Sequence, residues 1–152
     1  MKLTWKPRTT ETGDPLVLGD NTRDLRGAGC KVIQSFLPQF AQQVSVNAYP
    51  RGEEVETFGR GNIQTALAAV IHYEFRTVGE CSAWAFRLGQ LVRSQGTLEI
   101  NHGDGYRSVV EGVWQSIVPG DITGVALTVT FQFLGGLARP GTATTNQAGV
   151  AQ

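Results

Sequence analysis

The sequence lacks most of the features that mark metal-binding, redox or nucleic-acid-binding proteins. It has two cysteines, Cys30 and Cys81, which are far apart and without the paired spacing of a zinc site or a disulfide framework. We therefore expect both to be reduced and structural. Thirteen Lys and Arg residues balance thirteen Asp and Glu residues. The chain therefore lacks the positive charge that attracts a domain to nucleic acid or anionic lipid.

Long hydrophobic runs are also missing. The stretch MKLTWKPRTTETGDP has lysines but no apolar segment of the length a secretory signal needs, and no run of 18 apolar residues follows it. We expect no membrane partner. Charged residues make up only 17% of the 152 residues, and 19 are glycine. This composition predicts one domain rich in strands and turns, with a thinly charged surface that suits protein partners.

Alternation of apolar and polar residues predicts β-strands in the middle and near the end of the chain. The strongest signals are IQTALAAVIHYEFRTV and ITGVALTVTFQFL. In each, one face carries the larger apolar residues and the other carries small or polar ones. The predicted core-facing residues are Ile63, Thr65, Leu67, Ala69, Ile71, Tyr73 and Phe75, then Val125, Leu127, Val129, Phe131 and Phe133.

Between these strands the apolar period changes to that of a helix, in GECSAWAFRLGQLVRSQG. We predict one amphipathic helix at about residues 80–95, with Gly96 at its C-terminal cap. Its apolar stripe comprises Cys81, Trp84, Leu88, Leu91 and Val92. The predicted fold class is mainly β, an antiparallel β-sandwich or barrel with this one inserted helix.

The remaining segments set the expected domain organisation. Residues 1–30 are rich in Pro and Gly, which predicts an N-terminal arm or long loop. KVIQSFLPQF predicts a short helix or an irregular buried segment that stops at Pro38. Residues 31–136 would then form the β-sandwich domain. Residues 137–152 lack an apolar period and are expected to be a flexible C-terminal tail.

Few residues suggest chemistry. His72 and Glu74 share a strand face, while His102 and Asp104 flank a glycine in a turn. Together they could form a metal site, and with it a small cupin-type enzyme using His72, Glu74 and His102. Nothing in the sequence brings the two pairs together. We therefore expect no metal site, no cofactor, no small-molecule substrate and no enzymatic activity.

Aromatic residues allow another function, a carbohydrate- or ligand-binding β-sandwich. A sugar or planar ligand would stack on exposed aromatic rings. The candidates are Trp5, Tyr49, Tyr106 and, if exposed, Trp114. Trp114, however, is in phase with Val110 and Val118, as a core or interface residue would be.

The order of the predicted elements resembles that of a known family. A long strand (IQTALAAVIHYEF) is followed by an amphipathic helix (ECSAWAFRLGQLVRS), a short strand (TLEI) and a closing hairpin (YRSVVEGVWQSIVPGDITGVALTVTFQFLGG). Over roughly residues 44–135, this order is similar to that of tail proteins of long-tailed bacteriophages and related contractile or prophage-derived tubes, including tail tube and distal tail proteins. The resemblance implies a β-sandwich or barrel flanked by one helix and assembled into stacked rings.

The resemblance also implies partners and a location. The chain would bind copies of itself in a ring, with a hexamer favoured, and would contact adjacent tail proteins, with DNA only as cargo passing through a lumen. It would reside in the virion tail after assembly in the host bacterial cytoplasm. The small, weakly polar strand faces that oppose the core are the predicted subunit interface. They comprise Ala66, Ala68, Val70, Ala126, Thr128 and Thr130.

Overall fold

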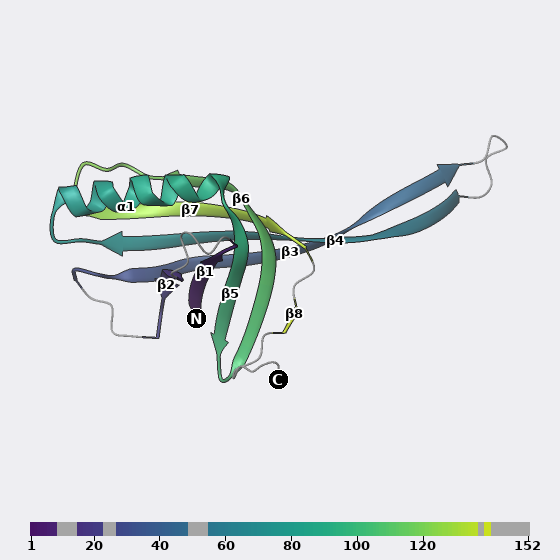
Figure 1. The fold of residues 1–152 in the computed structure, drawn as a ribbon, viewed down its shortest axis with the longest axis horizontal. Helices are drawn as coiled ribbons and strands as arrows, with labels where there is room; N and C mark the ends of the chain where they lie inside the picture. The colour runs from purple at the N-terminus through teal and green to yellow at the C-terminus, as the bar shows by residue number, and fades with distance from the viewer. Residues whose placement is uncertain (9–14, 23–26, 49–54, 137–138, 141–152) are drawn as a thin grey trace.

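The computed structural model describes residues 1–8, 15–22, 27–48, 55–136 and 139–140, which form eight strands and one α-helix (Figure 1). The strands are β1 (Lys2–Pro7), β2 (Leu16–Asp20), β3 (Lys31–Ala48), β4 (Val55–Glu74), β5 (Gln95–Gly103), β6 (Tyr106–Pro119), β7 (Ala126–Gly135) and β8 (Arg139–Pro140). The helix α1 (Val78–Gln90) continues into a 3-10 turn, η2 (Leu91–Arg93). The fold is mainly β with one inserted helix, as the sequence predicts.

All strands belong to one antiparallel sheet, in the order β2-β1-β5-β6-β7-β4-β3, with β8 pairing to β6. The first and last strands of this order approach each other. The Asn21 side chain bonds to the backbone of Ile33, and Lys31 Nζ donates to the Val17 carbonyl at 3.3 Å. The sheet is therefore coiled into an open barrel, and side chains bridge its seam.

Three glycines lie in a row across the sheet and allow its strands to bend. Gly112 pairs with Gly96 on one side and with Gly135 on the other. A Cβ on Gly96 would lie 2.3 Å from the Lys6 carbonyl oxygen, and one on Gly112 would lie 2.2 Å from that of Leu134. Only residues without a side chain fit this close backbone approach.

Aromatic rings from three strands fill the middle of the core. The Trp114 ring lies 5.3 Å from Trp5 and 4.9 Å from Phe133, measured between ring centroids. The alternation predicted for β7 is confirmed from Leu127 to Phe133, whose core-facing residues are all buried. Val125 instead is exposed, because it precedes the strand.

The helix begins at a polar cap and packs on this core. Thr77 is its N-cap, and its hydroxyl accepts a hydrogen bond from the Glu80 amide. The buried helix residues are Cys81, Trp84, Ala85 and Leu88. Helical structure ends at Arg93, earlier than predicted. Gly96 is not its cap but lies within β5, in the glycine row.

The prediction of an N-terminal arm over residues 1–30 is wrong for the described parts of that segment. β1 and β2 are members of the sheet, and Leu3, Trp5 and Leu18 are buried in the core. The physical reason is visible in KLTWKP, whose apolar residues alternate with polar ones. The core-forming domain therefore includes residues before 31.

The prediction of a helix or irregular segment at KVIQSFLPQF is also wrong, because these residues begin β3. Pro38 is tolerated because β3 is the last strand of the sheet order and needs no amide donor on its outer side. β3 and β4 form one long hairpin that projects from the body of the molecule (Figure 1). The predicted tail at 137–152 lies outside the described residues apart from β8.

Candidate functional site: an uncharged face of the sheet

The six residues predicted as a subunit interface come together on one face of two neighbouring strands. β4 contributes the first three and β7 the others. Val70 pairs with Thr130, and Ala68 lies opposite Gln132. The β4 residues are half-buried, whereas those of β7 are exposed. Since their neighbours along each strand point into the core, these residues form the outer surface of the sheet.

The same face continues over the strands on either side. Ser35 and Leu37 of β3 pair with Val70 and Ala68, and Val118 of β6 pairs with Thr130. Leu37 is 59% exposed and Val118 57% exposed. We call this surface the uncharged face. It comprises Ser35, Leu37, Gln39, Ala66, Ala68, Val70, Ser116, Val118, Ala126, Thr128, Thr130 and Gln132.

The polar side chains of the uncharged face are Ser, Thr and Gln, and some of them are hydrogen-bonded. Ser116 Oγ donates to Gln132 Oε1 at 3.2 Å. At one end, His72 lies 3.1 Å from Thr128 Oγ1 through Nδ1 and 3.3 Å from Glu74 Oε2 through Nε2. The Glu74 carboxylate therefore lies beyond the end of this surface and does not interrupt it.

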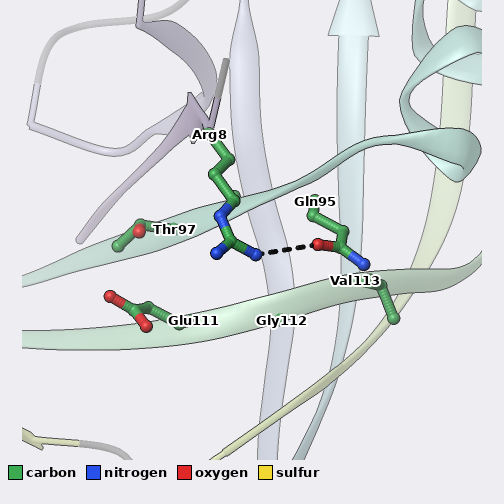
Figure 2. A pocket seen from close by; sticks show the side chains of 7 residues that line it. Arg8, Gln95, Thr97, Glu111, Gly112 and Val113 are labelled. Carbon is green, nitrogen blue, oxygen red and sulfur yellow. Dashed lines mark hydrogen bonds between the residues drawn. The ribbon is translucent and has the colours of Figure 1, made fainter.

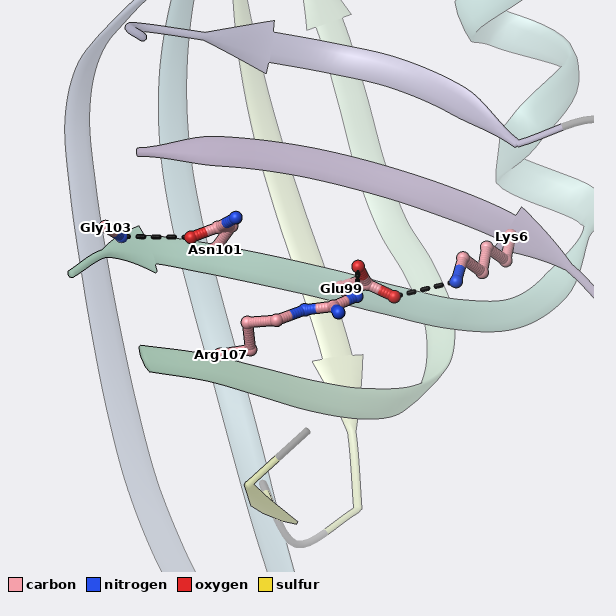
Figure 3. Close-up of polar contacts among 5 residues, drawn as sticks. All are labelled: Lys6, Glu99, Asn101, Gly103 and Arg107. Atoms are coloured by element: carbon pink, nitrogen blue, oxygen red, sulfur yellow. Dashed lines mark hydrogen bonds and ion pairs between the residues drawn. The ribbon is translucent and has the colours of Figure 1, made fainter. Parts of the chain in front are cut away.

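The outer surface of the other half of the sheet is different, because it carries interacting charges (Figure 3). On β1, β5 and β6, Lys6 Nζ lies 2.7 Å from Glu99 Oε2, and Arg107 pairs with the other carboxylate oxygen. Asn101 Oδ1 accepts a hydrogen bond from the Gly103 amide at 3.0 Å. One sheet thus presents a charged outer half and an uncharged outer half.

A polar pocket of about 430 Å³ lies on the outer surface of β5 and β6 (Figure 2). Arg8 Nη1 donates to Gln95 Oε1 at 3.1 Å across it. Its other lining residues are Gly96, Thr97, Glu111, Gly112 and Val113. One guanidinium, one amide and one carboxylate can bind polar groups, but the described residues bring no thiol or imidazole to it.

The histidine and carboxylate pairs considered as a metal site do not meet. His72 and Glu74 lie on the outer surface of β4, whereas the His102 ring packs near Phe36 and Tyr106. Among the described residues, no three His, Cys, Asp or Glu side chains form a group that could hold a metal ion. Burial, with the charge of the chain's amino terminus, lowers the pKa of His102.

The aromatic residues considered for ligand stacking have separate positions. Trp5 and Trp114 are buried core residues and cannot stack on a ligand at the surface. Tyr106 is 58% exposed, and Tyr49 lies outside the described residues. The expected phase of Trp114 with Val110 is confirmed, but Val118 faces outward because a β-bulge intervenes between Trp114 and Ser116.

Both cysteines occupy structural positions. Cys30 and Cys81 are buried and are not joined in a disulfide. Burial raises the pKa of each thiol and keeps it protonated near neutral pH.

Sequence reasoning found the centre of the uncharged face but missed Leu37 and Val118 at its sides. Each lies beyond a bulge that shifts the alternation of its strand.

No protein-family model matches the chain, and no curated protein matches its sequence. Within the described ranges, no helix has the length and apolar character needed to cross a membrane.

Proposed function

We propose that this chain is a structural subunit of a phage tail, forming a ring in the tail tube or at the junction between tube and tip. The observation that carries the proposal is the uncharged face. Leu37 and Val118 are large exposed apolar residues on either side of it, and small side chains lie between them. Depletion of charge is the compositional mark of an interface core.

The charge contrast between the two halves of the sheet supports the same conclusion. The outer surface of the other half of the same sheet does carry charged groups, Lys6, Glu99 and Arg107. A solvated face normally carries such groups, which keep proteins soluble and apart. A wide face without them is suited to contact with protein, and a second copy of the chain is the partner that the proposed ring provides.

The order of strands and helix supports a tail protein in particular. The long strand, the helix, β5 and the β6–β7 hairpin follow the order that the resemblance rests on. On this proposal the chain binds copies of itself, with a hexamer favoured, and contacts adjacent tail proteins in the virion tail. DNA would pass as cargo, and the protein would be assembled in the host bacterial cytoplasm.

The outer edge of β3 offers a second kind of contact in such an assembly. β3 is the last strand of the sheet order, and in the described part of the chain Asn21 bonds to its outer edge at Ile33. An unpaired edge can pair with a strand of another chain.

Mass photometry and negative-stain microscopy of the purified full chain test the proposal. We expect closed rings to appear as the protein concentration is raised. A protein that stays monomeric at every concentration, alone and with tail proteins from the same genome, would contradict it.

A further inference from the structure

An apolar groove opens between the base of the β3–β4 hairpin and the β5–β6 hairpin. Its volume is about 140 Å³. Two exposed aromatic side chains, Phe40 and Tyr106, are among its lining residues. The others include Phe36, Leu67, Ile100 and Val110, and no acidic side chain, lysine or arginine lines it within the described part of the chain.

The helix carries an exposed aromatic side chain of matching character. Phe86 is 74% exposed, although it lies in the middle of α1. The residues three and four positions away, which are its neighbours on a helix surface, are Ser82, Ala83, Gly89 and Gln90. All four are uncharged, and Ala83 and Gly89 have little or no side chain. The Phe86 ring therefore protrudes beyond its uncharged neighbours on the helix.

The groove and Phe86 lie at different ends of the core. In the core-facing row of β4, Thr65 lines the groove, whereas Tyr73 packs against Trp84 of the helix with ring centroids 5.4 Å apart. Eight strand residues span roughly 26 Å. Phe86 points away from the core that Trp84 enters, so it cannot reach the groove of its own chain.

We propose that Phe86 of one copy inserts into the groove of a second copy. This contact rests on the proposed function, in which copies of the chain assemble, and it assigns two surfaces distinct from the uncharged face. A cavity of roughly 150 Å³ lined by apolar side chains holds one benzene molecule. A groove of about 140 Å³ therefore suits one phenyl ring. Buried aromatic side chains are the usual anchors of protein interfaces.

In the proposed ring the contact is heterologous, because each copy offers Phe86 to one neighbour and its groove to another. Such a contact repeats from copy to copy and gives a ring or a stack instead of a closed dimer. Residues 141–152 are a poorer occupant of the groove. β8 pairs with β6 beside it, but residues 141–152 contain only Val150 as an apolar side chain larger than alanine.

Thiol cross-linking of mixed variants tests the contact while keeping Phe86 in place. Ala83→Cys puts an accessible thiol one helical turn from Phe86, and Ser108→Cys puts one in the groove. Cys30 and Cys81 are buried, so the unmodified chain is the blank. With a short bis-maleimide, we expect covalent dimers when the two variants are mixed and none from either variant alone. Val125→Cys, at another exposed position, should give none with Ala83→Cys.

A second substitution tests whether the cross-links depend on the phenyl ring of Phe86. Phe86→Ser, added to Ala83→Cys, should abolish the dimers and raise the protein concentration needed for assembly by about tenfold or more. Rings without mixed cross-links would overturn this contact and leave the proposed function intact. Dimers from either single variant alone would show that position 83 or position 108 lies beside the same position of another copy, which this contact does not bring together, and would overturn it as well. A protein that remains monomeric and gives no cross-links would overturn both.

Discussion

The side-chain amide of Asn21 takes the place of a missing strand beside Ile33. Its Nδ2 donates to the Ile33 carbonyl at 2.9 Å, and its Oδ1 accepts from the Ile33 amide at 2.8 Å. The backbone amide of Asn21 donates to the Met1 carbonyl at 2.8 Å and holds the residue in place. The Asn21 side chain thereby links the first and last strands of the sheet order across the seam of the open barrel.

Replacing this amide should open the seam. Asn21→Ala leaves both backbone groups of Ile33, a buried residue, without their partner. We expect the free energy of unfolding to fall by about 1–2 kcal/mol, as measured by chemical denaturation. Gln34→Ala, which removes an exposed amide from the same strand, should change it by less than about 0.5 kcal/mol. Equal effects of the two variants would mean that the Asn21 bridge contributes nothing specific.

Two glycines, Gly112 in the glycine row and Gly89 in the helix, should respond in opposite ways to substitution by alanine. A Cβ at position 112 would lie 2.5 Å from the Gly135 Cα as well as against the Leu134 carbonyl, so the backbone must shift. We expect Gly112→Ala to lower the melting temperature strongly and to reduce the free energy of unfolding by about 3 kcal/mol or more. Gly89, in the helix, has open space around it, and Gly89→Ala should stabilise by about 0.5–1 kcal/mol. Tolerance of alanine at 112 would contradict the described strand approach.

The two phenylalanines at positions 131 and 86 should differ sharply in their effect on stability. Phe131 is 2% exposed and packs against Trp114 with ring centroids 5.5 Å apart. Phe131→Ala should cost about 3–5 kcal/mol through the cavity it leaves. Phe86→Ala should cost less than about 0.5 kcal/mol in the monomer, because its ring is in solvent. Denaturation at a concentration below assembly would measure both.

Stability should fall in alkaline solution because of Tyr73. Burial raises the pKa of its hydroxyl, which donates to the Leu18 carbonyl. A raised pKa in the folded state favours the protonated form, so its stabilisation is complete below pH 10 and is lost as the pH rises above it. The loss should approach about 1.4 kcal/mol per pH unit.

Tyr73→Phe isolates this contribution. The variant should be slightly less stable at pH 7, because it lacks the hydrogen bond, but its unfolding free energy should decline less steeply above pH 10. Cys30 and Cys81 also have raised pKa values, act in the same direction and are common to both proteins. Identical slopes for wild type and variant would show that the Tyr73 hydroxyl reaches water.

Much of the fold was predictable wherever one periodicity continues without a break. The alternation in β7, the core-facing row from Thr65 to Tyr73 and the buried stripe of α1 follow directly from the sequence. The sequence also contains a signal for the start of the helix, because Thr77 followed by Glu80 is a pairing typical of a capping box.

The errors arise where one residue interrupts a period. In β3, a bulge near Gln34 puts both Ile33 and Phe36 on the inner side, a spacing that resembles a helical turn. The bulge after Trp114 similarly moves Val118 outward. Bulges depend on pairing with distant strands, so local pattern does not reveal them. The groove needs four strands to meet and has no local signal at all.

A charge placed in the middle of the uncharged face tests the central claim most directly. Thr130 is exposed and lies between Val70 and Val118. We expect Thr130→Arg to melt within about 2 °C of wild type, because the core uses the opposite face, yet to remain monomeric at concentrations where wild type forms rings. Thr123→Arg, which adds the same charge in the loop before β7, should still assemble. Rings of undiminished yield from Thr130→Arg, seen by mass photometry and microscopy, would contradict the account.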